Sequence, residues 1–481
     1  MNPQKLHTPS SRPHRWFRRV RATFFVAVAL VSLWVFFYAV ENWRGRRAFE
    51  RSRLELEAKG EKMAWADWLP KPVPDASNFF KAPGMAGLFG LTNGQSHLPS
   101  GLPRLPEGYS KDLPFAMSDL KQLPRQSSRP DEKSLASLIE WFQQQEPLFQ
   151  QIESAAQRPA GQLGRDPEEP FSGGWLHFAN LRNAAQLLAT RAKAQLLAGQ
   201  PDAAARSLAL LGRLAQVTCQ DHPPFLVECM VGVAISGLEV QTLREGLAQR
   251  LWSEPSLAAC QSQLQRLQLL EILQESIRVE RAASTFTLQH WPGSRFPKAA
   301  VTGDKHTWFD PEALFLRFGP HGSLLQDVVL MQWLEQPFIE AIQNRGREVN
   351  PLGLATMETS LPRGTHLGFM ARNMIPNLGR ALRATAQAQC SVRQAQIACA
   401  LERYRLAHGA YPDSLAALVP RFLDKVPPDV IAGATFQYRR RADGTYLLYS
   451  VGWNQKDDGG VEIKSSDGRR QPDAGDWIWE L

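Results

Sequence analysis

The most pronounced hydrophobic feature of the chain is an uncharged run of nineteen residues, Ala22 to Val40, close to the N-terminus. At a rise of ~1.5 Å per residue, an α-helix of this length spans about 28 Å, which is close to the hydrocarbon thickness of a bilayer. Trp34 and Tyr38 lie toward the end of the run, and Trp43 lies just beyond it, where interfacial aromatic residues are expected. The pattern therefore predicts a transmembrane helix over residues 22–40.

Basic residues flank this run on both sides, which disfavours a buried core helix. Those before it are Lys5, Arg12, Arg15, Arg18, Arg19 and Arg21, and those after it are Arg44, Arg46 and Arg47. A cleaved signal peptide is the stronger rival, but the run is long, and Phe37 and Tyr38 occupy positions where a cleavage site needs small residues. We expect a single-pass protein of the inner membrane with a basic cytoplasmic tail (1–21) beside anionic lipid headgroups, and a periplasmic domain after residue 40.

The next segment, residues 41–131, changes character twice. Residues 41–69 mix acidic and basic side chains and predict a helix leaving the bilayer, with too few apolar residues for a deep core. Between Pro70 and Pro130 lie ten of the 34 prolines of the chain. This proline-rich part predicts a spacer or an extended strap over the surface.

From residue 132 the apolar residues recur at helical spacing, which predicts an α-helical domain over residues 132–365, with essentially all of 132–290 helical. Gly199 can end one helix and Pro201-Asp202 can start another, so residues 187–216 predict a helical pair. Further helices are expected at 224–250, 254–290 and 324–343, with an irregular excursion over 291–323.

The pair over 187–216 resembles a tetratricopeptide-type hairpin. Small residues at the expected contact, Ala192, Ala194 and Ala203 to Ala205, let two helices approach closely. The resemblance covers about thirty residues, and no 34-residue repeat is evident. An ordinary helical hairpin is the alternative.

The C-terminal region, 366–481, predicts a long helix followed by a small β-sheet module. Cys390, Ile397, Leu401 and Tyr404 form one apolar helical face, with Gln394 as its polar member. Gly409 suits the helix end. The segments expected to be strands are 436–440 and 445–452, joined through the hairpin signal Asp443-Gly444.

This order resembles the soluble domain of the major, G-type pseudopilin of type II secretion systems. The matching elements are ALERYRLAHGAYPDSLAALVP (400–420), Pro428-Asp429, FQYRR (436–440), YLLYSVG (446–452) and an acidic DDGG loop (457–460). The chain departs from that family in two ways: it has no GFTLxE-type processing signal, and its membrane helix does not run directly into this region. We therefore interpret the chain as an anchored helical protein that carries a pseudopilin-like module.

The acidic loop is the candidate metal site. In the pseudopilin family this loop commonly binds calcium, and Asn454, Asp457 and Asp458 offer the hard oxygen ligands that calcium prefers. Lys456 counts against a cation, and a solvated turn is the alternative. The resemblance implies calcium as the cofactor.

Other chemistry leaves little trace in the sequence. The formal charge of +8 is concentrated at the N-terminus, without a basic and aromatic stripe elsewhere, so nucleic-acid binding is not expected. The five cysteines form no CxxC pair and are expected to be free buried thiols. His306 with Asp310 is typical of a loop hydrogen bond, and Ser118 with Lys121 matches SxxK by letters only, so an enzyme is not expected.

The sequence therefore predicts a mainly α protein with an N-terminal transmembrane helix, an α-helical array and a small α+β C-terminal module. We expect a membrane-anchored interaction or scaffold protein that contacts the lipid bilayer and other envelope proteins, in association with a secretion or type IV-pilus-like assembly. Two alternatives stay open at this stage: a cell-envelope enzyme with a dispersed site, and a purely structural envelope protein.

Overall fold

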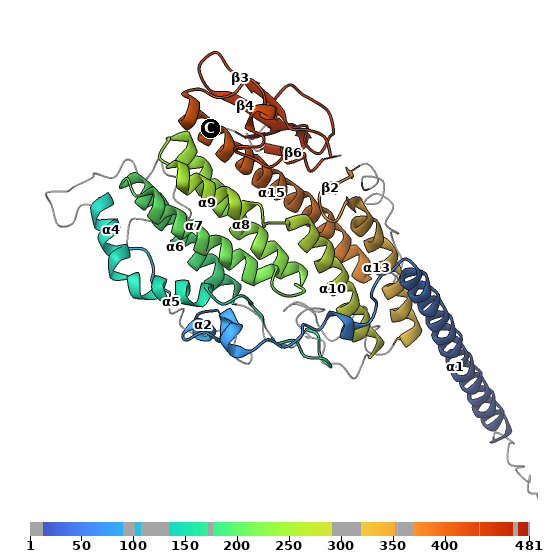
Figure 1. Ribbon diagram of the computed structural model, residues 1–481. Helices are drawn as coiled ribbons and strands as arrows, with labels where there is room; N and C mark the ends of the chain where they lie inside the picture. Colours follow the sequence, from blue (N-terminus) through green and yellow to red (C-terminus); the bar gives the residue numbers. More distant parts are fainter. Residues whose placement is uncertain are drawn as a thin grey trace, which may run out of the picture.

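The computed structural model is mainly helical, with one long helix projecting from a bundle of helices that carries a small β-sheet at its far side (Figure 1). It describes residues 13–89, 102–106, 134–162, 164–171, 177–290, 319–351, 354, 369–431, 433–464 and 470–479. The mainly α fold class is confirmed.

The projecting helix is α1 (Pro13–Ala58), which contains the whole apolar run 22–40. It is long and apolar enough to span a membrane, and none of its most apolar window is buried in the protein. From Tyr38 onward its side chains become partly covered, and Gly45 and Phe49 are buried. One unbroken helix thus leads from the candidate membrane span into the domain.

The helix α8 (Leu226–Ala248) is also apolar enough to span a membrane, but 56% of its window is buried. It lies in the middle of the bundle, and it contains the buried carboxyl groups of Glu228 and Glu239. It is therefore a core helix of the domain.

The predicted helix over 41–69 is too long, because α1 ends at Ala58 and the chain turns at Gly60, whose φ is +85°. The expectation that this part adds little to a core is also wrong. Trp65 and Trp68, in the short turn η1 (Trp65–Trp68), are buried against Phe225 and three aliphatic side chains of α10. Indole rings bury a large apolar area each, so two of them suffice to seat the turn.

The described part of the proline-rich region is packed rather than extended. Its elements are η2 (Asp75–Ser77), η3 (Phe79–Lys81) and α2 (Met85–Phe89). Phe79, Met85 and Phe89 are fully buried in the main core. Asn78 holds the segment in place, because its side chain donates to the Gln162 carbonyl at 2.8 Å and accepts from the Gln162 amide at 3.1 Å.

The helical array begins after Ser134, whose hydroxyl accepts from the amide of Ser137 at the start of the first helix. Its first elements are α4 (Leu135–Gln144), α5 (Glu146–Ala156), α6 (Phe178–Leu197) and α7 (Pro201–Cys219). Gly199 has φ +76° between α6 and α7, which confirms the predicted hairpin. Residues 157–162, 164–171 and 177 are not helical, so the expected helix content of 132–290 is only partly met.

The single helix expected over 254–290 is two helices, α9 (Glu254–Leu264) and α10 (Leu269–Gln289). A side chain from a distant helix explains the break. Gln389 accepts from the Leu269 amide at 2.6 Å and donates to the Leu267 carbonyl at 3.2 Å, so it replaces hydrogen bonds that the interrupted helix loses. This partner lies 120 residues away in the sequence and leaves no local signal.

Two more helices complete the bundle, α13 (His321–Ala341) and α15 (Phe369–His408), with the small hairpin β1 (Ile342–Gln343) and β2 (Glu348–Val349) after α13. The irregular excursion expected over 291–323 lies outside the described residues up to 318. The helix α15 packs against α8, α9, α10 and α13, and it ends at Gly409, whose φ is +81°. The helix expected in the C-terminal module is therefore also a central helix of the bundle.

After the turn η6 (Leu415–Leu418), β3 (Gln437–Arg440), β4 (Tyr446–Ser450) and β7 (Trp477–Trp479) form an antiparallel sheet in the order β3-β4-β7. Gly444, with φ +80°, closes the predicted hairpin between β3 and β4. A second antiparallel pair, β5 (Glu462–Lys464) and β6 (Arg470–Gly475), follows the acidic loop. The sheet packs on α15 (Figure 1), and one apolar core runs from Phe79 to Trp479.

Candidate functional site

The second half of α1 is joined to the domain by a close crossing with α13. A Cβ atom on Gly45 would lie 2.0 Å from the carbonyl oxygen of Gly322, so only glycine permits this approach. The Gly322 amide donates to Asn42 Oδ1 at 2.8 Å, and Gln326 Nε2 donates to Glu41 Oε2 at 2.9 Å. These bonds tie the first turn of α13 to α1 immediately beyond the apolar run.

A chain of hydrogen bonds continues the connection into the interior. Ser52 of α1 donates to Gln332 Oε1 of α13 at 2.8 Å, and Gln332 Nε2 donates to Thr285 Oγ1 of α10 at 3.1 Å. Gln332 is 1% exposed. Three helices are therefore connected by directional bonds that hold only in one register.

A buried ionic cluster fixes the chain just after α1. Glu61 accepts from Arg278 Nε at 2.8 Å and from Arg281 Nη2 at 2.5 Å, and Arg281, itself 1% exposed, also donates to Gln336 at 2.8 Å. Burial opposes ionisation of Glu61, but the hydrogen bonds and charges of the two arginines hold its pKa below the usual value. The end of α1 is thus held by a bidentate, charge-assisted contact. We call the contacts of α1 described here the α1 junction.

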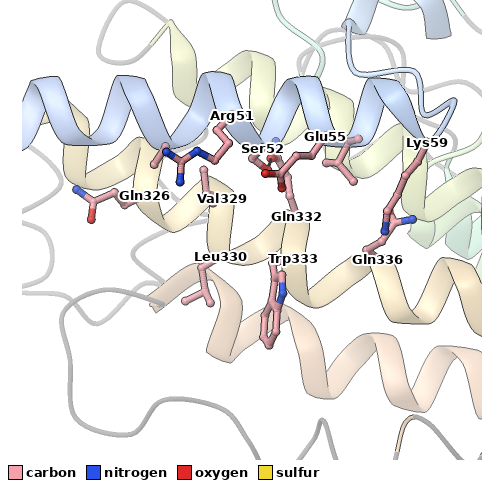
Figure 2. A pocket seen from close by; sticks show the side chains of 12 residues that line it. Arg51, Ser52, Glu55, Lys59, Gln326, Val329, Leu330, Gln332, Trp333 and Gln336 are labelled. Atoms are coloured by element: carbon pink, nitrogen blue, oxygen red, sulfur yellow. Dashed lines mark hydrogen bonds between the residues drawn. The ribbon is translucent and has the colours of Figure 1, made fainter.

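A groove of about 480 Å³ opens beside the α1 junction, along the seam between α1 and α13. It is lined from α1 by Ala48, Arg51, Ser52, Glu55 and Leu56, by Lys59 just after this helix, and from α13 by Gln326, Val329, Leu330, Gln332, Trp333 and Gln336. Figure 2 shows the charged side chains along α1 and the apolar ones along α13. Trp333 is 59% exposed, which is high for a tryptophan.

The chemistry of this groove suits binding. Its charged groups are Arg51 and Lys59 against Glu55, and Lys59 forms an exposed ion pair with Glu340 at 3.1 Å. The hydroxyl of Ser52 donates to Gln332, an amide that does not act as a base. An exposed indole beside aliphatic side chains and a few polar groups is the composition of a protein-binding surface.

The structure places the three predicted calcium ligands in one loop, between β4 and β5. Asn454 Nδ2 donates to Asp458 Oδ2 at 2.9 Å, while Asp457 Oδ1 accepts from the Tyr449 hydroxyl at 3.0 Å and from the Gly459 amide at 2.9 Å. A fourth residue, Asp476, organises the loop, as its carboxylate accepts from the amides of Gly460 at 2.6 Å, Val461 at 3.2 Å and Asp458 at 3.3 Å.

Calcium needs about six to eight oxygen ligands. Asp457 Oδ1 and Asp458 Oδ2 already accept hydrogen bonds from Tyr449, Gly459 and Asn454. Over the part of the chain that the structure describes, no three His, Cys, Asp or Glu residues form a group able to hold a metal ion. Calcium binding by Asn454, Asp457 and Asp458 stays a prediction.

The remaining candidates from the sequence are two residue pairs and the five cysteines. The pairs, His306 with Asp310 and Ser118 with Lys121, lie outside the described residues. All five cysteines are free and buried, as predicted. The groove and its exposed Trp333 were not predicted, because a surface between two helices 280 residues apart depends on tertiary packing.

Comparison of the chain with protein-family models, with curated proteins and with solved structures finds no match. The resemblances to the tetratricopeptide-type hairpin and to the pseudopilin domain therefore stay predictions.

Proposed function

We propose that this protein is a membrane-anchored scaffold of the cell envelope. In this proposal α1 crosses the inner membrane, the helical domain lies outside the cytoplasm at the bilayer surface, and the groove between α1 and α13 binds the juxtamembrane helix of another envelope protein.

The observation that carries the proposal is the continuity of α1 from its apolar run into the α1 junction. A flexible tether needs no glycine crossing, no bonded chain through Ser52 and Gln332, and no buried contact of Glu61. Fixed geometry at the membrane surface is useful to a protein that presents a binding surface at a set height and direction. This fixed geometry supports a scaffold role more directly than it supports a soluble domain on a flexible tether.

The position of the groove favours a helix as its occupant. Residues 48–58 of α1 lie about 12–27 Å beyond Val40 along the helix axis, at ~1.5 Å per residue. A second helix that leaves the bilayer beside α1 reaches this groove without a turn. Its apolar face would cover Trp333, Leu330 and Val329, while acidic side chains would face Arg51 and Lys59.

The resemblance of residues 400–460 to a pseudopilin domain suggests the kind of assembly. Its sheet lies across the bundle from the projecting part of α1 (Figure 1). We propose that a secretion or type IV-pilus-like assembly supplies the partner.

Site-specific photo-crosslinking in membranes tests the proposal. A photoreactive residue at Glu55, exposed in the groove, is expected to give one adduct of defined mass with a membrane protein. The same residue at Val227, 42% exposed on α8, is the matched control and should give none. Trp333→Ala should weaken the adduct at Glu55. Equal labelling at both positions, or no adduct at Glu55, would favour a purely structural role.

A further inference from the structure

A second cleft, of about 250 Å³, lies where the break between α9 and α10 meets α15 and the loop before β3. Its lining combines charged and amide side chains with Leu423, Pro427 and Pro428. The residues are Gln265, Gln268, Arg347, Gln389, Arg393, Gln396, Leu423, Asp424, Lys425, Pro427 and Pro428. Three of these carry a positive charge and one a negative charge, so the cleft is cationic.

The floor of the cleft contains a buried arginine without a carboxylate partner. Arg393, on α15, is 6% exposed, and its Nη1 donates to the Pro428 carbonyl at 2.9 Å. Among the described residues no carboxylate lies within ion-pair distance of it. The neighbouring Asp429 accepts instead from the Ile431 amide at 3.2 Å. A guanidinium has five N–H donors, so most of those of Arg393 are left for a molecule in the cleft.

Burying a cation in this way is costly unless an anion compensates. Burial lowers the pKa of Arg393, which is the direction expected for a desolvated cation that lacks sufficient compensation. Two other described arginines with buried side chains do have a carboxylate partner: Arg281 binds Glu61, and Arg165 binds Glu228 at 2.5 Å. Arg393 is the exception that faces a cleft.

The rim supplies two further cations. Arg347, after the β1 strand, and Lys425 are both exposed and form no ion pair with any described residue. Asp424 is the one carboxylate of the lining. The walls are fixed, since Gln396 donates to the Leu264 carbonyl at 2.9 Å and Gln389 bonds both sides of the break between α9 and α10. A rigid, cationic cleft is preorganised for an anion.

We propose that this cleft binds a small anion through a carboxylate or phosphate group, with the guanidinium of Arg393 as the central donor and Arg347 and Lys425 at the rim. The planar fork of an arginine matches the two oxygens that either group presents. The Nε2 groups of Gln268 and Gln396 already donate within the protein, so their side-chain oxygens are left as acceptors for hydroxyl or amide groups on the rest of the ligand. This inference is independent of the groove at the α1 junction.

Titration calorimetry on the full chain in detergent tests the inference, with inorganic phosphate and succinate as the two probes at constant ionic strength. Saturable binding of at least one probe, in excess of chloride, is expected, and the probe that binds identifies the anionic group. Arg393→Gln should weaken binding by more than about tenfold, because a charged hydrogen-bond donor is lost in a desolvated site.

Variants at exposed positions of the cleft test the inference even if Arg393→Gln misfolds. Arg347→Gln and Lys425→Gln should each weaken binding by about threefold to fivefold, as expected for partly screened charges. Arg206→Gln, an exposed change on α7 away from the cleft, should leave the affinity unchanged. If neither probe binds more strongly than chloride, or if Arg206→Gln weakens binding as much as the rim variants do, the inference is wrong.

Discussion

Gln394 is the polar residue on the apolar face predicted for α15, and the structure gives it a partner. Its Nε2 donates to the Trp477 carbonyl of β7 at 2.7 Å, and the side chain is 2% exposed. The sequence shows that a polar side chain interrupts the face, but not that a strand 83 residues later accepts its hydrogen bond. The hydrogen-bond partner of a polar residue on an apolar face therefore cannot be predicted from the local sequence pattern.

Asp476 raises the same difficulty at the predicted calcium loop. The loop and its three candidate ligands are evident from the sequence, because acidic residues next to two glycines mark a turn. The carboxylate that holds the turn lies sixteen residues after Gly460 and just before a strand. A single aspartate there carries no distinguishing sequence signal.

We predict that Asp476→Asn destabilises the protein by about 2 kcal/mol, because the amide cannot accept three backbone hydrogen bonds as a carboxylate does. Thermal melting of the full chain measures the loss. Asp457→Ala should cost less, as it removes bonds on the exposed side of the loop. Melting with calcium and with chelator completes the experiment: a higher melting temperature in calcium that Asp457→Ala abolishes would restore the calcium site.

At the scale of elements, α1 was only half predictable. The uncharged run from Ala22 to Val40 marks its first half without ambiguity. Its second half enters the domain through Gly45 and the sparse apolar residues Phe49 and Leu56, both buried. Such a pattern is close to that of an exposed, charged helix, so packing against α13 leaves little trace in the sequence.

The close crossing at Gly45 in the α1 junction leads to a prediction about stability that has a matched control. Gly45→Ala places a Cβ 2.0 Å from a backbone oxygen of α13, so the helices must separate, and we expect a loss of about 2 kcal/mol or more. Gly237→Ala, inside α8, meets nothing within 4 Å and should stabilise the protein by about 0.5–1 kcal/mol. The melting temperatures of the two variants should move in opposite directions. A Gly45→Ala protein as stable as the wild type would show that α1 is not held at this crossing.

At the scale of the whole molecule, the regions on the two sides of the predicted boundary between residues 365 and 366 share one core. The helix α15 contacts both the bundle and the sheet. Hydrophobic periodicity identifies α15 as a helix but does not say which elements cover each of its faces. The groove beside α1 and the cleft at Arg393 were unpredictable for the same reason, since each is lined by residues from distant parts of the chain.

The buried carboxyl groups predict how the stability of the molecule depends on pH. Burial raises the pKa of Glu239 to about 8, of Glu335 to about 8 and of Glu280 to about 7, from an unfolded value of 4.5. Between those values the folded protein binds protons that the unfolded chain releases, so the free energy of unfolding falls as pH rises from about 5 to 8. The opposite contribution, from the lowered pKa values of Glu61 and Glu228, is lost below about pH 4.5.

We therefore expect a higher melting temperature near pH 5.5 than near pH 8.5, because most of this pH window lies between the two values. Glu239→Gln tests one contribution, because the amide resembles the protonated acid that accepts from Gln263 at 2.6 Å. The variant should lose less stability than the wild type over this interval. Parallel curves for the two proteins would mean that Glu239 is ionised in the folded state, in contradiction to its burial.

We predict the orientation of the whole molecule from charge and size. The segment before the apolar run is rich in arginine, and positively charged flanking segments stay in the cytoplasm, whereas large domains cross regardless of their charge. We predict that a cytoplasm-dependent fluorescent reporter fused after residue 481 stays dark, while a reporter active only outside the cytoplasm is active. Deletion of residues 22–40 should reverse both signals, because it removes the segment that directs the domain across the membrane.

The mass of the purified protein should show an intact N-terminus, since Phe37 and Tyr38 do not form a cleavage site. Fluorescence from the full-length fusion would contradict the orientation, and a mature N-terminus near residue 41 would contradict the anchor. A mature N-terminus near residue 41 would also mean that no membrane helix leads into the groove, and it would remove the reason to expect a helical membrane partner there.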